Sequence, residues 1–539
     1  MQQQRLYLFS CLRDAGSHKM LILGREMCES GWKALYSIGE RRLWEIKKLL
    51  ARKASTPYGS LPRLKKPSAE FLQAKTWLQS YAKQFSERLP DREEYRLPSC
   101  ITKQAVYDLY RDDMMKASQK VLGRSSFHEM WQKALPDVKI SKSEGGQARC
   151  TPCINIEIVL LGMQLSKEVR KEIEGKRTIH LNLQSDCRSK YYKHIKKASE
   201  YPEKYVSLII DNMDQAKTRL PTFSSYSKVE AHLHKIQHHV TGVKAHHLEK
   251  TFILTWTDQF FPDCNITINS LVYTLHEISK RNGGMLPPTL YLQADNSGKD
   301  NKNAFVLTFL AWLVKKGIFK KVKLCFLMVG HTHEDIDQVF SRISTHMRHV
   351  DAPTLPALLH GITESTTPTP EVLEVKGIYD YKSCFEDVRG MIEGISGPHQ
   401  FMLKEKNGKV ILHYKDWPTD AVYKTLDFND RIPDDLNLMQ VAVNPKMEVE
   451  SGKMRNDLPK WNQSGRLSEE NVEWWNEYLF IQEHEPNLPP VHQLPCYTET
   501  EQSRNSGAEH LVDAISASVE RHNKQSVLRV KGKRRSRIS

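Results

Sequence analysis

The sequence lacks an apolar run of membrane-spanning length. Its longest apolar run, residues 304–314, is interrupted by Thr308, whereas a helix needs about 20 apolar residues to cross a bilayer. The first residues, M-Q-Q-Q-R, lack the apolar stretch of a secretory signal peptide. We therefore expect neither a membrane span nor a signal peptide.

Glycine-rich phosphate loops and internal repeats are missing as well. Neither G-x-x-x-x-G-K-[ST] nor G-x-G-x-x-G occurs in the chain. These loops let backbone amides surround the phosphates of a bound nucleotide. Their absence removes support for a nucleotide-binding enzyme of those classes.

Cysteine is also sparse, with ten residues in a chain of 539. Apart from Cys150 and Cys153 the cysteines are scattered, which favours reduced thiols over a disulfide framework. This pattern predicts a cytosolic or nuclear protein.

Positive charge is unevenly distributed along the chain. The net charge is +15, and residues 1–200 contain 38 Lys and Arg against 22 Asp and Glu, whereas residues 201–539 contain 41 against 42. Residues 351–500 are acidic, with 14 against 25. This segregation predicts an N-terminal half that faces a polyanion and an acidic module that does not.

The N-terminal pattern predicts two short helices within residues 24–52, separated by a break at 37–39. The second helix opens with Arg41 and Arg42. A helix-turn-helix needs this arrangement to direct basic side chains at DNA. An ordinary helical hairpin with a solvated basic face is the alternative.

Residues 53–68 are rich in proline and basic residues and predict a linker, whereas residues 69–200 read as helical. Within the latter we expect Thr102 and Ser125 to cap helices. Cys150 and Cys153 form half of a zinc site, since two thiolates two residues apart can share one metal but a tetrahedral site needs two more ligands. The candidates for completing it are Cys187, His180 and His194, and the alternative is a pair of unrelated thiols.

From residue 205 onward, strands and helices alternate. We predict strands at 205–210, 238–245, 252–256, 290–294 and 322–329, and helices beginning at Asn265 as cap, at Ala304 and near Glu334. The order β-β-β-α-β-α-β-α, with nearly continuous apolar strands, is typical of a sheet covered on both faces. It is the element order of a ribonuclease-H-like domain.

The C-terminal part contains a strong hairpin pattern. Residues 401–414 alternate around Asn407 and Gly408, a pair that favours a type I′ turn. A helix with Trp474 and Trp475 follows, and the chain ends with a basic cluster at 531–537. That cluster predicts nuclear localisation or nucleic-acid contact, with a frayed charged terminus as the alternative.

These patterns predict a multidomain α+β fold with helical N-terminal modules, a central α/β ribonuclease-H-like domain and a C-terminal β-containing module. The predicted divisions are a helix-turn-helix-like module at 1–52, a basic linker at 53–68, a helical module with the zinc half-site at 69–200, the ribonuclease-H-like domain at 201–350, an acidic accessory module at 351–498 and a disordered basic tail at 499–539.

Carboxylates fall where this topology brings chain segments together. Asp211 ends the first strand, Asp295 ends the fourth, and Glu334, Asp335 and Asp337 open the last helix. Phosphoryl transfer on nucleic acid is served by two divalent metals that activate the attacking oxygen and stabilise the leaving one. Mg²⁺ and Mn²⁺ prefer such carboxylate oxygens.

The segments D-N-S-G-K-D-N-K-N (295–303) and G-H-T-H-E-D-I-D (330–337) resemble a eukaryotic transposon-derived family related to DDE/D transposases and integrases. The resemblance covers residues from about 28 to 347. It implies that Asp211 and Asp295 are the first two Mg²⁺ or Mn²⁺ ligands and that Asp337 is the third, with Glu334 and Asp335 as rivals.

The same resemblance implies that His331 and His333 shape the site or contact phosphate. It implies further that Asn296, Asn301 and Lys302 hold the loop and the nucleic-acid backbone; the alternative is that they only cap the helix starting at Ala304. The implied activity is metal-dependent cleavage or strand transfer of DNA by a nuclear protein. A domesticated, non-catalytic DNA-binding protein is the alternative function.

A third hypothesis comes from H-T-H-E-D-I-D at 331–337, which resembles the dinuclear-zinc motif of metallo-β-lactamase-fold hydrolases. It would require His331, His333 and Asp335 to converge with a distant histidine such as His238 or His239. The expected partner is DNA rather than a membrane. A homo-oligomer and a further partner for the acidic module stay compatible with the sequence.

Overall fold

The structure is a computed structural model that describes residues 2–14, 20–22, 25–52, 67–88, 94–97, 101–140, 150–162, 165–332, 334–385, 394–484 and 491–497. The chain divides into two compact units, residues 1–74 and 75–539. His333, most of the predicted linker (53–66) and the predicted tail (499–539) lie outside the described residues. Among the described helices, none has both the length and the apolar composition to cross a bilayer.

The first unit contains a small helical cluster. Its elements are α1 Gln2–Asp14, β1 Leu21–Ile22, β2 Arg25–Glu26, α2 Glu29–Leu35 and α3 Glu40–Ala51. The predicted helix pair and its break are confirmed, with Ser37 in the left-handed region (φ 50°) at the turn. Trp32, Ile38, Leu43 and Ile46 are buried together with residues of α1, so the basic side chains of α3 occupy its outer face.

The second unit begins within α4 and opens with helices around a three-stranded sheet. These elements are α4 Ala69–Phe85, β3 Glu87–Arg88, β4 Tyr95–Leu97, α5 Lys103–Lys116, α6 Arg124–Ala134, β5 Val138–Ile140, α7 Thr151–Gly162 and the long α8 Lys167–Glu200. Thr102 caps α5 as predicted, accepting a hydrogen bond from the Ala105 amide at 3.1 Å. The prediction for Ser125 is wrong, because the N-cap of α6 is Gly123, two residues earlier.

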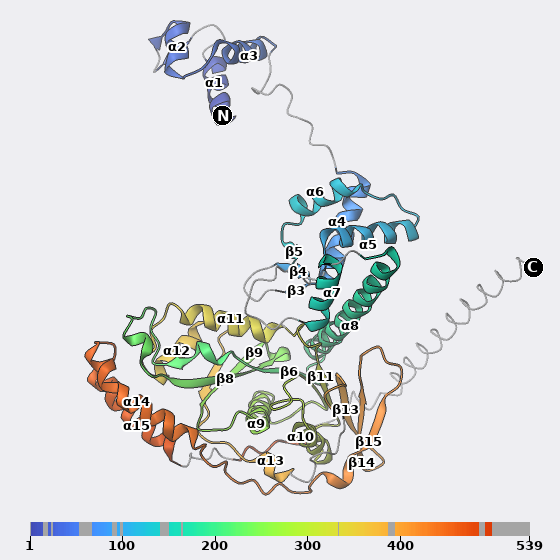
Figure 1. The fold of residues 1–539 in the computed structure, drawn as a ribbon, viewed down its shortest axis with the longest axis vertical. Coiled ribbons are helices and arrows are strands. Elements are labelled where there is room, and N and C mark those ends of the chain that lie inside the picture. The colour runs from blue at the N-terminus through green and yellow to red at the C-terminus, as the bar shows by residue number, and fades with distance from the viewer. Residues whose placement is uncertain are drawn as a thin grey trace, which may run out of the picture. The chain divides into compact units, whose positions relative to one another are not determined.

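The remainder of the second unit is built on a ten-stranded mixed sheet (Figure 1). Its strands are β6 Tyr205–Asn212, β7 Arg219–Leu220, β8 Ile236–Ala245, β9 Lys250–Thr257, β10 Thr289–Ala294, β11 Lys321–Phe326, β12 Glu371–Glu374, β13 Gln400–Lys406, β14 Lys409–Lys415 and β15 Lys424–Asp427. Apart from β7, which pairs with β8, their order is β12-β9-β8-β6-β10-β11-β13-β14-β15.

The central strands confirm the predicted element order. β6, β8 and β9 are successively antiparallel, whereas β10 and β11 run parallel to β6 and follow the helices α9 Cys264–Arg281 and α10 Ala304–Lys315. The strand predicted to reach Val329 ends at Phe326. The N-cap of α9 is Asp263 rather than Asn265, because the Asp263 carboxylate accepts the Asn265 amide at 2.9 Å.

The sheet continues beyond residue 350 at both edges. β12 pairs with β9, and β13 pairs with β11 and leads into the predicted hairpin with β14. Asn407 and Gly408 both have positive φ (54° and 73°), as a type I′ turn requires. The segments after residue 350 thus complete the same sheet that begins at Tyr205.

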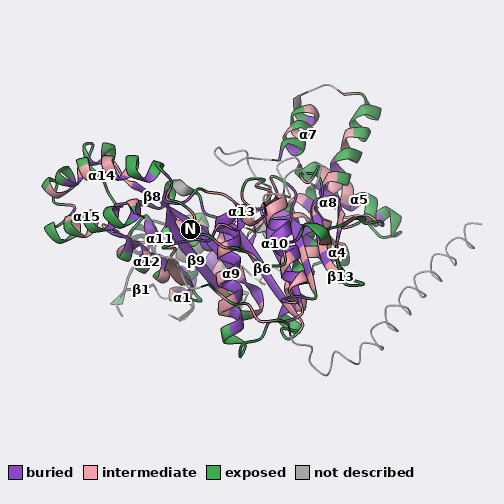
Figure 2. Ribbon diagram, turned by 90° about the horizontal axis from the view of Figure 1, so that it is seen from below, coloured by how far each residue is buried: buried purple, intermediate pink, exposed green. Residues whose placement is uncertain are grey.

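Both faces of the central strands of this sheet are buried, which explains their apolar sequences (Figure 2). On one face, Val206, Leu208 and Ile210 of β6 pack with residues of α9 and α10. On the other, Ile209 packs with residues of α11 Asp335–Met347, α12 Leu355–Glu364, α14 Lys446–Gln463 and α15 Glu469–Glu483. The remaining helix of this part, α13 Tyr381–Cys384, contributes Tyr381 to the first face.

Gly242 provides a test of how closely α11 packs on the sheet. A Cβ atom at this position would lie 2.8 Å from Phe340 Cε1 and 2.9 Å from Ile336 Cδ1, both on α11. We expect Gly242→Ala to lower the free energy of unfolding by about 1–3 kcal/mol in urea denaturation, because a packed helix must shift.

Gly452→Ala in α14 is the matched control, because no atom lies within 4 Å of the added methyl group. We expect this variant to gain about 0.5–1 kcal/mol from the better helix propensity of alanine. Equal changes in the two variants would contradict the packing account.

Candidate metal centre and carboxylate edge

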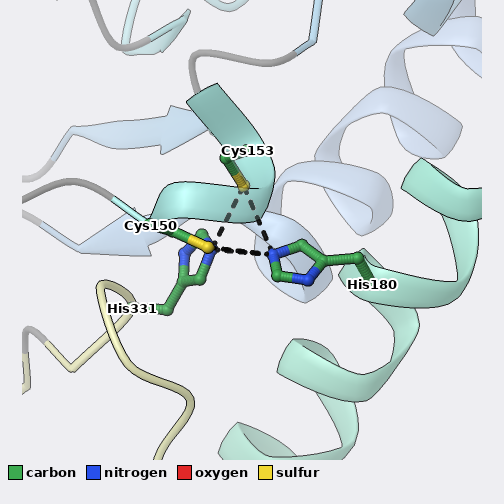
Figure 3. Close-up of side chains that lie close together, drawn as sticks. All are labelled: Cys150, Cys153, His180 and His331. Carbon is green, nitrogen blue, oxygen red and sulfur yellow. Dashed lines mark hydrogen bonds between the residues drawn. The ribbon is translucent and has the colours of Figure 1, made fainter. Parts of the chain in front are cut away.

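Two cysteines and two histidines converge in the second unit (Figure 3). Cys150 directly precedes α7 and Cys153 lies in its first turn, so both thiols share one side of the helix start. His180 projects from α8, and His331 comes from the loop between β11 and α11. Their four ligand atoms all lie within 4.8 Å of one another.

Glycine 330 allows the loop to reach the cysteines. Its φ is +79°, a conformation that other residues rarely adopt, and a Cβ atom there would lie 2.5 Å from the backbone Cα and N of Cys150. The loop therefore approaches the start of α7 as closely as its backbone permits. This close approach places the His331 side chain next to the thiols of Cys150 and Cys153.

The distances match the edges of a tetrahedral metal site. His180 Nε2 lies 3.3 Å from Cys150 Sγ, Cys153 Sγ and His331 Nε2, and Cys153 Sγ lies 3.3 Å from His331 Nε2. Zinc bonds of about 2.3 Å to sulfur and about 2.0–2.1 Å to nitrogen separate tetrahedral ligand atoms by about 3.3–3.8 Å. The group can therefore hold a metal such as zinc with four protein ligands.

The environment also favours the thiolate, which is the form that binds metals. The hydrogen bond from Cys153 lowers the pKa of Cys150, burial opposes this effect, and the hydrogen bonds of His180 and His331 lower the pKa further, to about 2. Cys150, Cys153 and His331 are each 4% exposed, so bulk water contributes little to this group.

The sequence predicted only part of this group. Cys150 and Cys153 are confirmed as neighbours, and of the three completing candidates only His180 joins them. Cys187 is buried elsewhere, where burial raises its thiol pKa to about 12. His194 stacks on Tyr291, with ring centroids 4.0 Å apart.

His331 completes the group, although the resemblance had implied that it shapes the carboxylate site. It lies 178 residues from Cys153 along the chain, a separation that no spacing rule covers. Gly330 is the one local feature that could have pointed to it, since a glycine before a histidine permits a close backbone approach.

Asp211 and Asp295 belong to neighbouring parallel strands. Ile210 of β6 pairs with Ala294 of β10. Asp211 is the next residue of β6, and Asp295 directly follows the last residue of β10. The two aspartates therefore lie at the same edge of the sheet.

The loop after Asp295 is held by the polar residues that follow it. Asn301 donates a side-chain hydrogen bond to the Asp295 carboxylate, and Asn296 donates to the Leu327 carbonyl at 2.6 Å. Lys302 Nζ donates to Asn296 Oδ1 at 3.1 Å and to the Ser396 carbonyl at 2.8 Å, and burial lowers its pKa to about 8.

The cap of α10 is a different residue. Asn303 accepts the Val306 amide at 3.0 Å. Asn296, Asn301 and Lys302 therefore hold the loop, as the resemblance implied, and the helix-cap alternative for them is wrong.

All three carboxylates near α11 are engaged by groups of the same chain. Glu334 accepts from Arg188 Nε at 2.8 Å and from the Tyr192 hydroxyl at 2.9 Å, and burial raises its pKa although Arg188 opposes this effect. Asp337 accepts the Glu334 backbone amide at 3.0 Å and completes a capping box with Glu334.

Asp335 has three partners. It accepts from the Tyr191 hydroxyl at 2.6 Å and lies 3.1 Å from both Lys244 Nζ and His246 Nε2. Burial alone would raise its pKa, but the hydrogen bond and charge of His246, followed by the charge of Lys244, lower it well below the usual range. Asp335 is therefore a half-buried anion paired with cationic groups of the same chain.

The described residues contain one group of three or more metal-ligating side chains with mutually close ligand atoms, the Cys/His group above. Asp211, Asp295 and Asp337 do not form a second group at that distance. The metallo-β-lactamase arrangement is likewise not formed by its described members: His331 contacts Cys153, Asp335 pairs with His246, and His239 lies 3.0 Å from Asp258.

The arginines expected to face DNA lie on α3 in the first unit. Arg41 is 3.6 Å from Glu45, one turn along the helix, and its side chain is 94% exposed. Arg42 occupies the next position of the same first turn. Both residues thus stand at the start of the second helix of the predicted pair.

Residues 228–420 match the family model described as Domain of unknown function (DUF7869). The matched segment contains Asp295, His331 and Asp337 but begins after Asp211 and after the other three Cys/His residues. No curated protein matches the chain.

The Arg188–Glu334 pair is the buried ion pair that holds α8 to the start of α11, with side chains 7% and 2% exposed. We expect Arg188→Met to lower the free energy of unfolding by about 3–5 kcal/mol at neutral pH, because Glu334 loses its cation. This loss should shrink in acid, where Glu334, with its raised pKa, becomes protonated.

The double variant Arg188→Met with Glu334→Gln is the control, because it removes both charges. Urea denaturation followed by circular dichroism measures all three proteins. A double variant as unstable as the single one would show that packing, not the unpaired charge, causes the loss.

Proposed function

We propose that the sheet around β6 is a ribonuclease-H-like domain. Three antiparallel strands (β6, β8, β9) followed by two strands parallel to β6 (β10, β11), with α9, α10 and α11 interleaved, support this proposal. The additional strands β12 to β15 extend it at both edges.

We further propose that the protein acts on DNA as a transposase-like or integrase-like enzyme. The observation that carries this proposal is the placement of Asp211 and Asp295 at the same edge of the sheet, near the carboxyl ends of two neighbouring parallel strands. Two such carboxylates suit Mg²⁺ or Mn²⁺, which would activate the attacking water or 3′-hydroxyl and stabilise the leaving oxygen of a phosphodiester.

Asp337 is our choice for the third carboxylate. Glu334 and Asp335 neutralise Arg188 and Lys244 of the same chain, so their charge is already compensated. The resemblance of residues 295–303 and 330–337 to transposon-derived proteins supports the same reaction class and a nuclear location.

A non-catalytic DNA-binding protein is the second candidate function. It is favoured by the absence of Asp211, Asp295 and Asp337 from the group of possible metal ligands found among the described residues. In this alternative the sheet serves only as a structural scaffold without catalytic activity, and the basic residues of the chain bind DNA.

We also propose that the metal of the Cys/His group is Zn²⁺ and that it is structural. Four protein ligands leave no open position for a substrate or a reactive water. The ligands come from α7, α8 and the loop before α11, so the ion would hold the helical part of the second unit to the sheet.

The zinc proposal predicts about one zinc ion per chain by mass spectrometry of the purified protein. Cys153→Ala should lose the ion, whereas Cys187→Ala, which removes a buried thiol outside the group, should keep it. Zinc at about 1,000 times its Kd should stabilise the wild type by about 4 kcal/mol over the chelated protein, because only the folded state has the site. Zinc retained by Cys153→Ala would contradict the assignment.

The DNA proposal predicts Mg²⁺-dependent nicking or strand transfer on supercoiled plasmid and linear duplex DNA. Asp295→Asn should lower the rate by at least about a hundredfold, because an amide is a poor metal ligand that carries no charge. Asp435→Asn, at a side chain that is 92% exposed, is the matched control and should keep full activity.

Equal activity of wild type and Asp295→Asn would remove Asp295 from the reaction. Salt-sensitive DNA binding by both proteins, with no Mg²⁺-dependent product from either, would establish the non-catalytic alternative.

A further inference from the structure

A group of lysines lies on the sheet face that carries Asp211 of β6. Along β11, Val322, Leu324 and Phe326 enter the core with α10, so Lys321 and Lys323 fall on the opposite face. α8 crosses this face: its Lys197 Nζ lies 5.5 Å from the ring of Tyr205, and Lys323 Nζ lies 5.6 Å from the ring of Tyr291. Helix and strand lysines therefore meet there.

The lysines are close enough to affect one another's protonation. Burial lowers the pKa of Lys190, and the charges of Lys193, Lys415 and Lys197 lower it further. Burial also lowers the pKa of Lys323 to about 8, with Lys190, Lys321 and Lys197 acting in the same direction. We call Lys190, Lys193, Lys197 and Lys323 the lysine track.

The described part of the chain supplies no carboxylate within ion-pairing distance of the lysine track. Other lysines of the same helix are paired, since Lys176 lies 2.7 Å from Glu172 and Lys196 lies 3.6 Å from Glu200. Gathering four cations without an anion disfavours the folded state. An external polyanion would offset this repulsion.

The shape of the track favours an extended polyanion over a small one. Lys190, Lys193 and Lys197 follow one side of α8 at helical spacing and span about 10 Å along its axis. Duplex DNA presents one charge for about every 1.7 Å of its axis, so a strand meets several lysines together. Lysine contributes a point charge without base-specific geometry, which suits backbone contact.

We propose that the lysine track binds the phosphodiester backbone of the DNA on which the protein is proposed to act. This inference rests on the proposed action on DNA and adds a surface that contacts the substrate. The contact is independent of sequence, because it involves phosphates only.

The test measures binding of the full chain to a fluorescent duplex of about 30 base pairs by anisotropy over a range of salt concentrations. The variant combines Lys190→Gln, Lys193→Gln and Lys197→Gln. Each lost phosphate contact lowers the slope of log K against log salt by about 0.9, so we expect the slope to fall by about 2–3.

The control removes three lysines from other helices, Lys280→Gln, Lys453→Gln and Lys460→Gln. Each of them has a carboxylate partner, at 2.9, 2.9 and 2.7 Å. The charge change is identical, and we expect the slope to change by less than about one contact. Replacing the three track lysines with arginine should preserve the wild-type slope, because the charge is kept.

Equal slopes for the track variant and the wild type, both folded by circular dichroism, would overturn the track while leaving Mg²⁺-dependent cleavage intact. A slope that falls for duplex RNA but not for duplex DNA would overturn the assignment of DNA as the ligand. Absence of salt-dependent binding by the wild type would overturn the track and the proposed function together.

Discussion

The parallel pairing of β6 with β10 is the constraint on which the rest of the second unit depends. β6 is apolar on both faces, so it can be stable only at the centre of a sheet that helices cover on both sides. Its pairing with β10 sets the register that places Asp211 beside Asp295. The strands outside this pair extend the sheet without altering that edge.

A second set of contacts fixes the last helix relative to this edge. α8 provides Arg188 for Glu334 and Tyr191 for Asp335, while His180 joins the Cys/His group with His331. All three contacts bind the short segment from His331 to Asp335. The position of Asp337 is therefore set by α8 as much as by β11, and the helical part of the unit is coupled to the edge of the sheet where Asp211 and Asp295 lie.

Local patterns predicted most of the sheet. The apolar runs ending at Asp211 and Asp295 and the Asn407-Gly408 turn each contain enough information within a few residues to define their element. The caps at Ser125 and Asn265 were each wrong by two residues, because several residues compete at a helix start and packing decides among them.

The candidate site was harder to predict, because its partners are distant in sequence. The spacing of Cys150 and Cys153 predicts that they share a site, but no residue near them in sequence indicates that His331 joins them. Likewise, no local pattern indicates that Arg188 neutralises Glu334. The lysine track is equally non-local, since it joins one face of α8 to the outer side of β11. The Cys/His group, the Arg188–Glu334 pair and the lysine track all depend on the register of the strands and on where α8 crosses the sheet, and only the folded structure gives these.

The close approach of Gly330 to Cys150 also has a consequence for recognising related chains. Any other residue at this position would meet the backbone of Cys150 and would have to adopt a positive φ. A relative that keeps the histidine but replaces the glycine would thus be unable to close the Cys/His group in this way. The Gly-His pair, read together with a distant C-x-x-C, therefore distinguishes chains that can form this Cys/His group from chains that cannot form it in this way.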